Sequence, residues 1–527
     1  MKNLLLLFLF CYGFTWAQED AWVYFTNKPD ADFYLNNPLE MLSQRALDRR
    51  ATQGIAPDAT DVPVHADYIL QVSQTPGITV MAQSRWFNAL HVRGEFANIQ
   101  ALQSLPFVAS VSYANHNLNA GRPLQEKFEP VNKNLDIQVD FPYGNSANQI
   151  QMLNGHLLHQ QDYTGAGKII AVLDAGYPGV NTLGAFARLR DNNLILGGYN
   201  FPDRDNNIYS RSNHGTLVLS TMGGYVQNQL VGTAPDAAYY LFITEDIFSE
   251  NPVEESYWVE AAEMADSLGV DVINSSLGYF GYDNPNYSYQ YADMNGITGF
   301  ASRGATLAAS KGMAVVISAG NSGAGANPHI NVPSDAINVL AVGAVNASGQ
   351  YAAFSSIGPS SDGRVKPDVM AQGQASVVAN TQGNVVTGSG TSFAGPILAG
   401  MVASLWQAAP GLTSTQIMQV IRESAHLFSN PNPQFGYGIP NFEQALQQAL
   451  GTQDFAGQDV VIYPNPFQAS LKVSMQQGEF SLFDSTGRLI LQQSLSSNPI
   501  DTAHLKAGVY FYRLTSGGVR TGKLIKQ

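Results

Sequence analysis

Cysteine is nearly absent from the 527-residue chain, and its single copy, Cys11, lies in the apolar stretch that opens the sequence. This stretch carries one lysine and is too short to span a bilayer, which is the pattern of a signal peptide. We expect residues 1–17 to be removed on export, and a buried N-terminal strand or helix is the alternative. The mature chain then has no thiol, which excludes disulfides and leaves stability to the core and any bound ions.

Charged residues are also scarce, at 13% of the chain, and 27 basic side chains against 41 acidic ones give a net charge of -14. A surface of that sign repels phosphate groups, so nucleic acid is not an expected partner. The 45% hydrophobic residues and 49 glycines are typical of a folded, turn-rich protein. The length predicts more than one domain.

Changes of pattern divide the chain into segments. Residues 18–120 alternate strand-like runs ("WVYF", "DYILQVS", "FVASVSY") with helical runs ("PLEMLSQRALDRRATQ", "FANIQALQSL"), which predicts an α+β module. Residues 121–142 are rich in Asn, Pro and Lys, have little periodicity and are expected to form an exposed linker. Residues 456–527 hold short strand-like runs separated by turn residues, which predicts a small C-terminal β-sandwich.

Residues 143–450 alternate helical stretches with strands that are apolar on both faces, such as "KIIAVLD", "VDVINSS" and "MAVVISAGN". Such strands predict an α/β fold with a parallel sheet covered by helices on both faces. The run "FAGPILAGMVASLWQAAP", which follows Ser392, predicts a long helix inside the core. Capping-box spacing at Asn251 with Glu254, and at Thr413 with Gln416, predicts the starts of two further helices.

Three polar residues stand at the ends of apolar segments, where the catalytic groups of open α/β sheets collect. Asp174 closes a predicted strand, His214 opens an apolar run and Ser392 precedes the long helix. Taken singly, each fits a structural role, such as a helix cap or a buried polar group with its own partners. Together they supply a nucleophile, a base and a carboxylate that orients the base, so the Ser392 hydroxyl is expected within hydrogen-bond reach of His214.

A fourth stretch, "VVISAGNSG", ends in Asn321, whose side-chain NH2 is a candidate donor to an oxyanion. The backbone N–H of Ser392 would be the second donor. Taken alone, Asn321 is more simply explained as a turn residue before Gly323.

The order Asp, His, Asn, Ser and the stretches "YTGAGKIIAVLDAGY", "HGTLVLSTMGG", "SAGNSG" and "GTSFAGP" resemble the subtilisin-like (subtilase, S8) serine peptidases. The resemblance extends over about residues 143–449. It implies hydrolysis of peptide bonds through an acyl-enzyme, with Asp174 as the orienting carboxylate and His214 as base and then acid. Ser392 would be the nucleophile, and Asn321 would lie in the oxyanion hole.

The resemblance also implies that Ser276, Leu277 and Gly278 bind the substrate main chain as an added strand, and a plain strand-to-loop turn is the alternative. One position departs from the family pattern. Ala175 follows the candidate Asp174, where the family usually has a Ser or Thr whose hydroxyl supports the carboxylate. We expect this loss to slow catalysis without abolishing it.

The flanking segments carry weaker resemblances. The 18–120 module resembles the propeptides that assist folding of subtilases and block their clefts until cut, and a permanent accessory domain is the alternative. The tail, with "YPNPF", "GVYFYRL" and "GKLIKQ", resembles the C-terminal sorting domain of Bacteroidota type IX secretion cargo. That resemblance implies export across the inner and outer membranes to the cell surface or medium. An adhesion or carbohydrate-binding sandwich is the alternative for the tail.

The sequence therefore predicts an exported serine endopeptidase made as a zymogen, which acts on proteins or peptides and contacts the secretion machinery through its tail. A catalytically weak, subtilase-shaped binding or adhesion protein is the alternative. The chemistry requires no cofactor, and we expect a monomer. A structural calcium ion is compatible with the family but has no assigned ligands, because the carboxylates of Asp203, Asp205 and Asp283 are scattered and only weak candidates.

Overall fold

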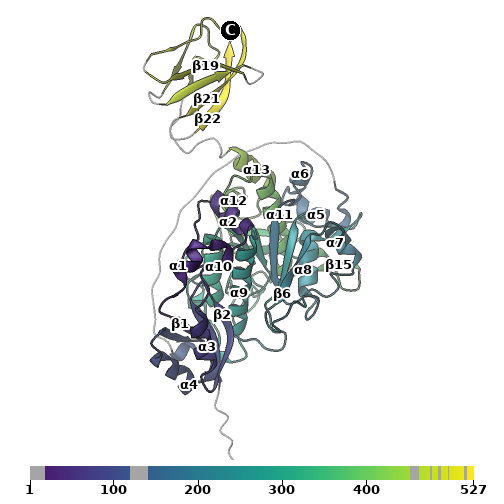
Figure 1. The fold of residues 1–527 in the computed structure, drawn as a ribbon. Coiled ribbons are helices and arrows are strands. Elements are labelled where there is room, and N and C mark those ends of the chain that lie inside the picture. Colours follow the sequence, from purple (N-terminus) through teal and green to yellow (C-terminus); the bar gives the residue numbers. More distant parts are fainter. Residues whose placement is uncertain are drawn as a thin grey trace, which may run out of the picture. The chain divides into compact units, whose positions relative to one another are not determined.

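A computed structural model describes residues 18–118, 141–451, 462–474, 478–484, 488–496, 498–515 and 519–527 (Figure 1). The predicted signal peptide, most of the predicted linker and the start of the predicted tail lie outside the described residues. The contacts divide the chain into a large unit that ends at Ala449 and a small unit that begins at Leu450. In the described part of the chain, no helix combines the length and hydropathy needed to cross a bilayer.

The large unit is built on a seven-stranded sheet in the order β13-β12-β11-β10-β5-β9-β6. All neighbouring strands run parallel. The strands are β5 (Ile169–Asp174), β6 (Ile195–Asn200), β9 (Ala238–Ile243), β10 (Val272–Ser275), β11 (Ala314–Ser318), β12 (Leu340–Val345) and β13 (Val369–Gln372). The predicted parallel sheet is confirmed, and β5, β10, β11 and β12 are buried along their whole length.

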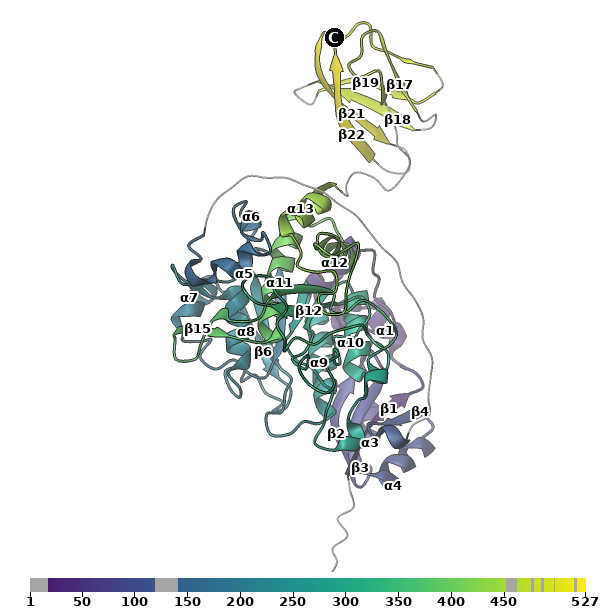
Figure 2. The same ribbon diagram turned by 180° about the vertical axis from the view of Figure 1, so that it is seen from behind.

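Helices cover both faces of this sheet (Figures 1 and 2). Ile170 of β5 packs with α8 (His214–Gly223) and α11 (Thr391–Ala408) on one face. Ala171, the next residue of the strand, packs with α9 (Val253–Leu268) and α10 (Phe300–Ser310) on the other. Because successive side chains of a strand point to opposite faces, both faces of β5 must be apolar, as its sequence is.

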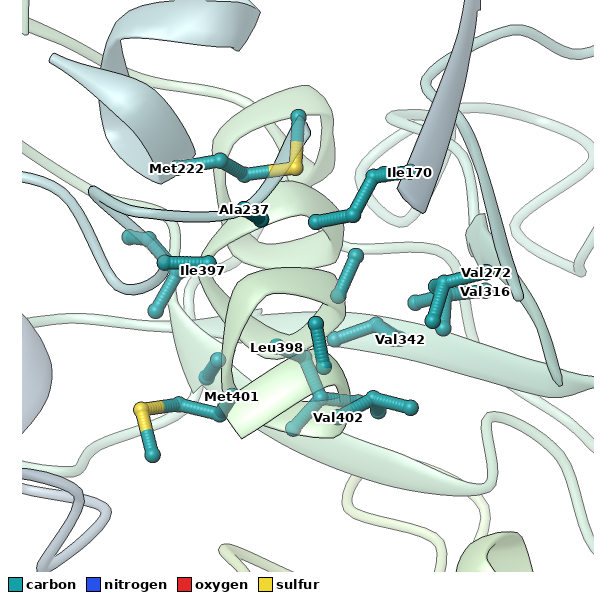
Figure 3. Close-up of a cluster of buried hydrophobic side chains, with 14 of the residues drawn as sticks. Ile170, Met222, Ala237, Val272, Val316, Val342, Ile397, Leu398, Met401 and Val402 are labelled. Atoms are coloured by element: carbon teal, nitrogen blue, oxygen red, sulfur yellow. The ribbon is translucent and has the colours of Figure 1, made fainter. Parts of the chain in front are cut away.

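Helix α11 lies inside the core, as predicted. Figure 3 shows Leu398 and Val402 of α11 on the side of Val342 of the sheet, whereas Ile397 lies on the side of the helix away from Val272. All of these side chains belong to one buried apolar cluster. The catalytic region also contains further helices and strands. They are α5 (Ala147–Gln151), α6 (His156–His159), α7 (Ala187–Asp191), α12 (Ser414–Glu423), α13 (Phe442–Gly451), β7 (Tyr225–Val226), β8 (Leu230–Val231), β14 (Ser376–Ala379) and β15 (Val385–Gly388).

The two predicted capping boxes have different outcomes. At α12 the Thr413 side chain and the Gln416 side chain bond each other's backbone N–H groups, so that prediction is confirmed. At α9 a helix begins at Val253, near the predicted start, and half of the box forms, because the Glu254 carboxylate accepts the Asn251 backbone N–H at 3.0 Å. The reciprocal bond is missing: Pro252 is the N-cap residue, and the Asn251 side-chain oxygen accepts hydrogen bonds from Arg93 Nη2 at 2.9 Å and the Val253 N–H at 3.4 Å.

The N-terminal module is a four-stranded antiparallel sheet in the order β2-β3-β1-β4, with short helices. Its elements are β1 (Gln18–Phe25), α1 (Ala31–Asn36), α2 (Gln44–Thr52), α3 (Ala66–Ser73), β2 (Ile78–Ser84), β3 (Ala89–Glu95), α4 (Phe96–Ala101) and β4 (Val108–Tyr113). One face of the sheet forms the module's own core, and the other face packs on α9 and α10. The run "DYILQVS", predicted as a strand, is helix α3, in which Tyr68, Ile69 and Val72 face the core at helical spacing.

The small unit consists of two antiparallel sheets around one core. A three-stranded sheet has the order β16-β17-β20, and a four-stranded sheet has the order β19-β18-β21-β22. The core includes Phe467, Leu471, Phe480 and Leu514. The strands are β16 (Ile462–Tyr463), β17 (Ser470–Val473), β18 (Glu479–Phe483), β19 (Leu489–Ser494), β20 (Ile500–Asp501), β21 (Gly508–Thr515) and β22 (Val519–Lys526).

Candidate active site

The candidate catalytic residues all come from one edge of the sheet. Asp174 is the last residue of β5, and Asn321 follows the end of β11. His214 is the first residue of α8, and Ser392 lies in the first turn of α11. The helices that follow parallel strands begin at the carboxyl edge of the sheet, which is why side chains so distant in sequence meet there.

Gly176 allows the segment before His214 to approach the end of β5. Its φ is +146°, and a Cβ atom there would lie 2.2 Å from the backbone oxygen of Ser210. A bridge also pairs Gly176 with Arg211. Any larger residue would push this segment away and move His214 from Asp174.

Asp174 and His214 form a direct hydrogen bond. His214 Nδ1 lies 2.7 Å from Asp174 Oδ1, which also accepts the N–H of Ala175 at 2.7 Å. The Asp174 side chain is fully buried, whereas 34% of the His214 side chain is exposed. The Asp174 carboxylate raises the pKa of His214 above its usual value, and burial opposes this effect. The bond holds the Nδ1 proton toward Asp174 and leaves Nε2 as the basic nitrogen.

Ser392 is buried, with 8% of its surface exposed, and its hydroxyl donates to the Ser276 carbonyl at 3.4 Å. The Ser276 hydroxyl in turn donates to the Ser392 carbonyl at 3.0 Å. The ring of Phe393, the next residue, has its centroid 6.4 Å from that of His214.

The expected hydrogen bond between Ser392 and His214 is not formed within the described residues, because the hydroxyl is turned to Ser276. Catalytic hydrogen bonds of this kind are often long or misaligned until substrate binds.

Thr391 fixes the orientation of the Asn321 side chain. Asn321 Oδ1 accepts the Thr391 backbone N–H at 2.8 Å and the Thr391 hydroxyl at 3.0 Å. The amide oxygen is thereby committed, and the Nδ2 hydrogens remain as the available donors. The first N–H groups of α11 have no partner inside the helix, and the positive end of the helix dipole lies there. This arrangement is suited to binding a developing negative charge.

The segment of Ser276, Leu277 and Gly278 continues β10 past its last residue, Ser275. It contacts Ser392 through Ser276, and Tyr279 forms a bridge with Val332 just beyond it. Gly278 is exposed. The structure therefore brings all three predicted substrate-binding residues to the catalytic edge.

Sequence reasoning missed Glu245, which follows the end of β9. Its carboxylate accepts hydrogen bonds from the hydroxyls of Tyr279 at 2.8 Å and Thr244 at 3.0 Å. Burial raises the pKa of Glu245 to about 7, and its charge contributes to the raised pKa of His214. The signal was present, since Glu245 ends an apolar strand run as Asp174 does.

The buried Asp174 carboxylate is incompletely bonded. Its Oδ2 atom has no hydrogen-bond partner in the part of the chain that the structure describes. The next residue, Ala175, contributes its backbone N–H to Oδ1 but has no hydroxyl to offer. Asp174 therefore lacks the hydroxyl hydrogen bond whose absence was expected from the sequence.

The three candidate calcium ligands make bonds within the protein. Asp203 holds Arg211 through both carboxylate oxygens, at 2.8 and 2.6 Å. Asp205 and Asp283 each accept a backbone N–H. Among the described residues, no group of three His, Cys, Asp or Glu side chains is placed to share a metal ion. A calcium ion stays a prediction without assigned ligands.

The N-terminal module is held on α9 by polar contacts. Glu263 accepts hydrogen bonds from the Ser84 hydroxyl at 2.6 Å and from the backbone N–H groups of Arg85 at 3.2 Å and Trp86 at 3.0 Å. Asp266 pairs with Arg49 at 2.6 Å. These contacts dock the module directly on the catalytic region.

Comparison with known proteins agrees with this organisation. The sequence matches the subtilase family over residues 165–438, the Bacteroidota propeptide domain of peptidase S8 over residues 20–131, and a secretion system C-terminal sorting domain over residues 461–527. Subtilisin NAT of Bacillus subtilis subsp. natto is 31% identical over 319 residues, which cover 58% of this chain and 71% of that protein. Subtilisin of Bacillus pumilus is 30% identical over 319 residues, which cover 58% of this chain and 98% of that protein.

The fold is also found in a crystal structure of the epidermin leader peptide processing serine protease from Staphylococcus aureus. The likeness has a TM-score of 0.54 at 14% identity and covers 84% of this chain and 100% of that one. The subtilase match, together with the propeptide and sorting domains, shows that the chain is an exported serine endopeptidase made as a zymogen. The chain belongs to the subtilase family of serine peptidases.

Proposed function

We propose that the peptidase cleaves its substrates with Ser392 as nucleophile, His214 as general base and then acid, and Asp174 as the carboxylate that orients His214. The observation that carries this assignment is the 2.7 Å bond between the buried Asp174 and His214, at the edge where α11 presents Ser392. A hydroxyl is a weak nucleophile unless an adjacent base removes its proton, and the raised pKa of His214 suits that base.

The proposed reaction has two halves. Ser392 Oγ attacks the carbonyl carbon as its proton passes to His214 Nε2, and the oxyanion accepts hydrogen bonds from Asn321 Nδ2 and the Ser392 N–H. His214 then gives the proton to the leaving amine, and the acyl-enzyme remains. Water then attacks the ester as His214 takes its proton, and His214 returns this proton to Ser392 Oγ when the carboxylic acid product leaves. These proposed steps use side chains, one backbone N–H group and water, so they require no cofactor.

Ser276, Leu277 and Gly278 are proposed to bind the substrate main chain as an added strand. Two facts support this role: the segment extends β10 at the catalytic edge, and Ser276 contacts Ser392. Backbone pairing holds any sequence, so pockets for side chains must supply selectivity.

Export is proposed to use the signal peptide at the inner membrane and the sorting domain at the outer membrane, through the secretion machinery. The match of residues 461–527 to a sorting domain supports the second step. We propose that the secreted enzyme is a monomer.

Labelling by a fluorophosphonate, together with casein cleavage by the processed protein, tests the catalytic assignment. We expect wild type to be labelled and active, and Ser392→Ala to lose both properties. Ser404→Ala is the matched control, because Ser404 lies in the same helix with its hydroxyl bonded to the Thr233 carbonyl at 3.0 Å. Labelling of Ser392→Ala, or no labelling of processed wild type, would contradict the assignment.

A further inference from the structure

Arg211, three residues before His214, has a strained backbone conformation. Its φ is +63°, in the left-handed region that residues other than glycine rarely adopt. Residues in this region persist only where the surrounding structure holds them, and they gather at functional sites. The next residue, Ser212, donates its backbone N–H to the Ala175 carbonyl at 3.1 Å. The strained segment is therefore bonded directly to the residue that follows Asp174.

The Arg211 side chain is bonded to loops that follow two other strands of the sheet. Its Nε and Nη2 atoms donate to the two carboxylate oxygens of Asp203, after β6, at 2.8 and 2.6 Å. Its Nη1 atom donates to the Glu245 carbonyl, after β9, at 3.2 Å and lies 3.5 Å from Asp246 Oδ1. Only 10% of the Arg211 side chain is exposed. One guanidinium thus ties both loops to the segment before His214.

Asp203, the main partner of Arg211, is itself held by the end of β6. The side chain of Asn200, the last residue of β6, is buried and donates from Nδ2 to Asp203 Oδ2 at 2.8 Å. The Asp203 N–H returns a hydrogen bond to Asn200 Oδ1 at 3.2 Å. Because β5, β9 and β6 are neighbours in the sheet, Arg211 joins the carboxyl ends of three adjacent strands. A planar guanidinium with five donors can make all these bonds at once.

We propose that Arg211 is a positioning residue for the peptidase reaction, which holds the segment before His214 so that the imidazole stays bonded to Asp174 and faces Ser392. This inference rests on the proposed function. Without the guanidinium, the left-handed backbone at Arg211 would relax and displace the residues that follow it. A displacement of about 1 Å in a catalytic group can lower the rate as much as a hundredfold.

The test measures kcat and KM of the processed enzyme on a quenched fluorescent peptide. Arg211→Met keeps the length of the side chain but removes every donor. We expect kcat to fall about tenfold, because the base is displaced, and KM to change less than about twofold. KM should hold because the proposed substrate-binding segment continues β10, which lies on the other side of β5 from the loops that Arg211 joins.

Arg188→Met is the matched control. Arg188 also donates to both oxygens of one carboxylate, that of Asp236, at 2.8 and 2.9 Å. Asp236 precedes the first residue of β9 and so lies at the opposite edge of the sheet from the catalytic residues. This variant should keep the wild-type kcat, and Arg211→Lys should recover part of the rate that Arg211→Met loses. A kcat of Arg211→Met within about twofold of wild type overturns the proposal, as do equal losses in the two Met variants.

Asp203→Asn separates positioning from a direct effect of charge. If Arg211 acted on His214 only through its charge, removing this cation and removing the anion would move the acid limb of kcat/KM in opposite directions. A positioning role instead predicts a lower kcat in both variants, about threefold lower for Asp203→Asn, which keeps one acceptor. The double variant should be no slower than Arg211→Met alone.

Asp203→Asn also decides the question if Arg211→Met does not fold, because the Asp203 side chain is 45% exposed. A wild-type kcat in Asp203→Asn overturns the proposal. Fluorophosphonate labelling of the same proteins distinguishes this result from a failure of the catalytic assignment. Labelled wild-type enzyme with unchanged kcat in the variants disproves the role of Arg211 alone, whereas wild-type enzyme that is not labelled disproves the catalytic assignment itself.

Discussion

Replacing Arg50 by Met should loosen the N-terminal module from the catalytic region. Arg50, in α2, has no exposed side-chain surface and pairs with two carboxylates that are also fully buried. Two of its nitrogens bind Asp61 within the module at 2.8 and 2.7 Å, and the guanidinium also binds Asp266 of α9. The substitution keeps the bulk of the side chain and removes a charge that bridges these two acids.

The size of the stability loss depends on which ion pairs the two carboxylates keep after the substitution. Breaking a buried ion pair by removing one partner costs about 3–5 kcal/mol, because the other charge stays buried. Asp61 keeps Lys311 at 3.1 Å, and Asp266 keeps Arg49 at 2.6 Å, so neither carboxylate is left alone. We therefore expect a loss near the lower limit, about 3 kcal/mol in the free energy of unfolding.

Urea unfolding of the zymogen measures this loss, in a Ser392→Ala background that prevents autolysis. Arg45→Met is the matched control in the same helix, since its 37% exposed side chain pairs with Asp271 at 2.7 Å. The control should lose roughly 1 kcal/mol or less. A smaller loss for Arg50→Met than for the control would refute the reasoning.

Three further predictions concern catalysis. His214→Ala and Ser392→Ala should lower kcat equally, and the double variant should lower it no further, because the two residues act as a unit. Additive losses of kcat in the double variant would contradict this prediction. Activity should fall as the pH drops through the raised pKa of His214, since the imidazolium cannot accept the Ser392 proton. Glu245→Gln should move this acid limb of kcat/KM to lower pH, and an unmoved limb would rule out its influence. If the added hydroxyl of Ala175→Thr reaches Asp174 Oδ2, its kcat should be about fivefold higher than that of the isosteric variant Ala175→Val. This ratio corresponds to ~1 kcal/mol, the energy of one hydrogen bond. Equal rates for the two variants would exclude that contact.

The central strands of the sheet could be predicted because burial on both faces leaves a continuous apolar run. The edge strands β6 and β13 were not predicted. Two glycines, Gly197 and Gly198, interrupt the apolar pattern of β6, and pairing with β9 rather than side-chain burial defines that strand. The error at α3 has a related cause. A short run with few polar residues fits both the helical period of 3.6 residues and the strand period of two residues. Only packing then decides between helix and strand.

The candidate site was predictable where a residue ends a strand or begins a helix. Asp174, His214 and Ser392 stand at such positions, and the family resemblance supplied their roles. The orientation of Asn321 also required the fold, since Thr391, distant in sequence, bonds its amide oxygen.

Docking of the N-terminal module on helix α9 should depend on pH through two buried acidic residues, Glu260 and Glu263, because burial raises the pKa of both carboxyl groups. Burial raises the pKa of Glu260 to about 7 from its usual 4.5, while Glu260 accepts the Gln83 N–H at 3.0 Å. Between these pH values the docked state holds more protons than the separated parts, so docking weakens as the pH rises through the window.

The measurement is gel filtration of Ser392→Ala protein, cleaved in the linker, between pH 5 and pH 8. The module should be released more readily at the higher pH, and Glu260→Gln should flatten the dependence. Tighter docking at higher pH would show that other groups dominate.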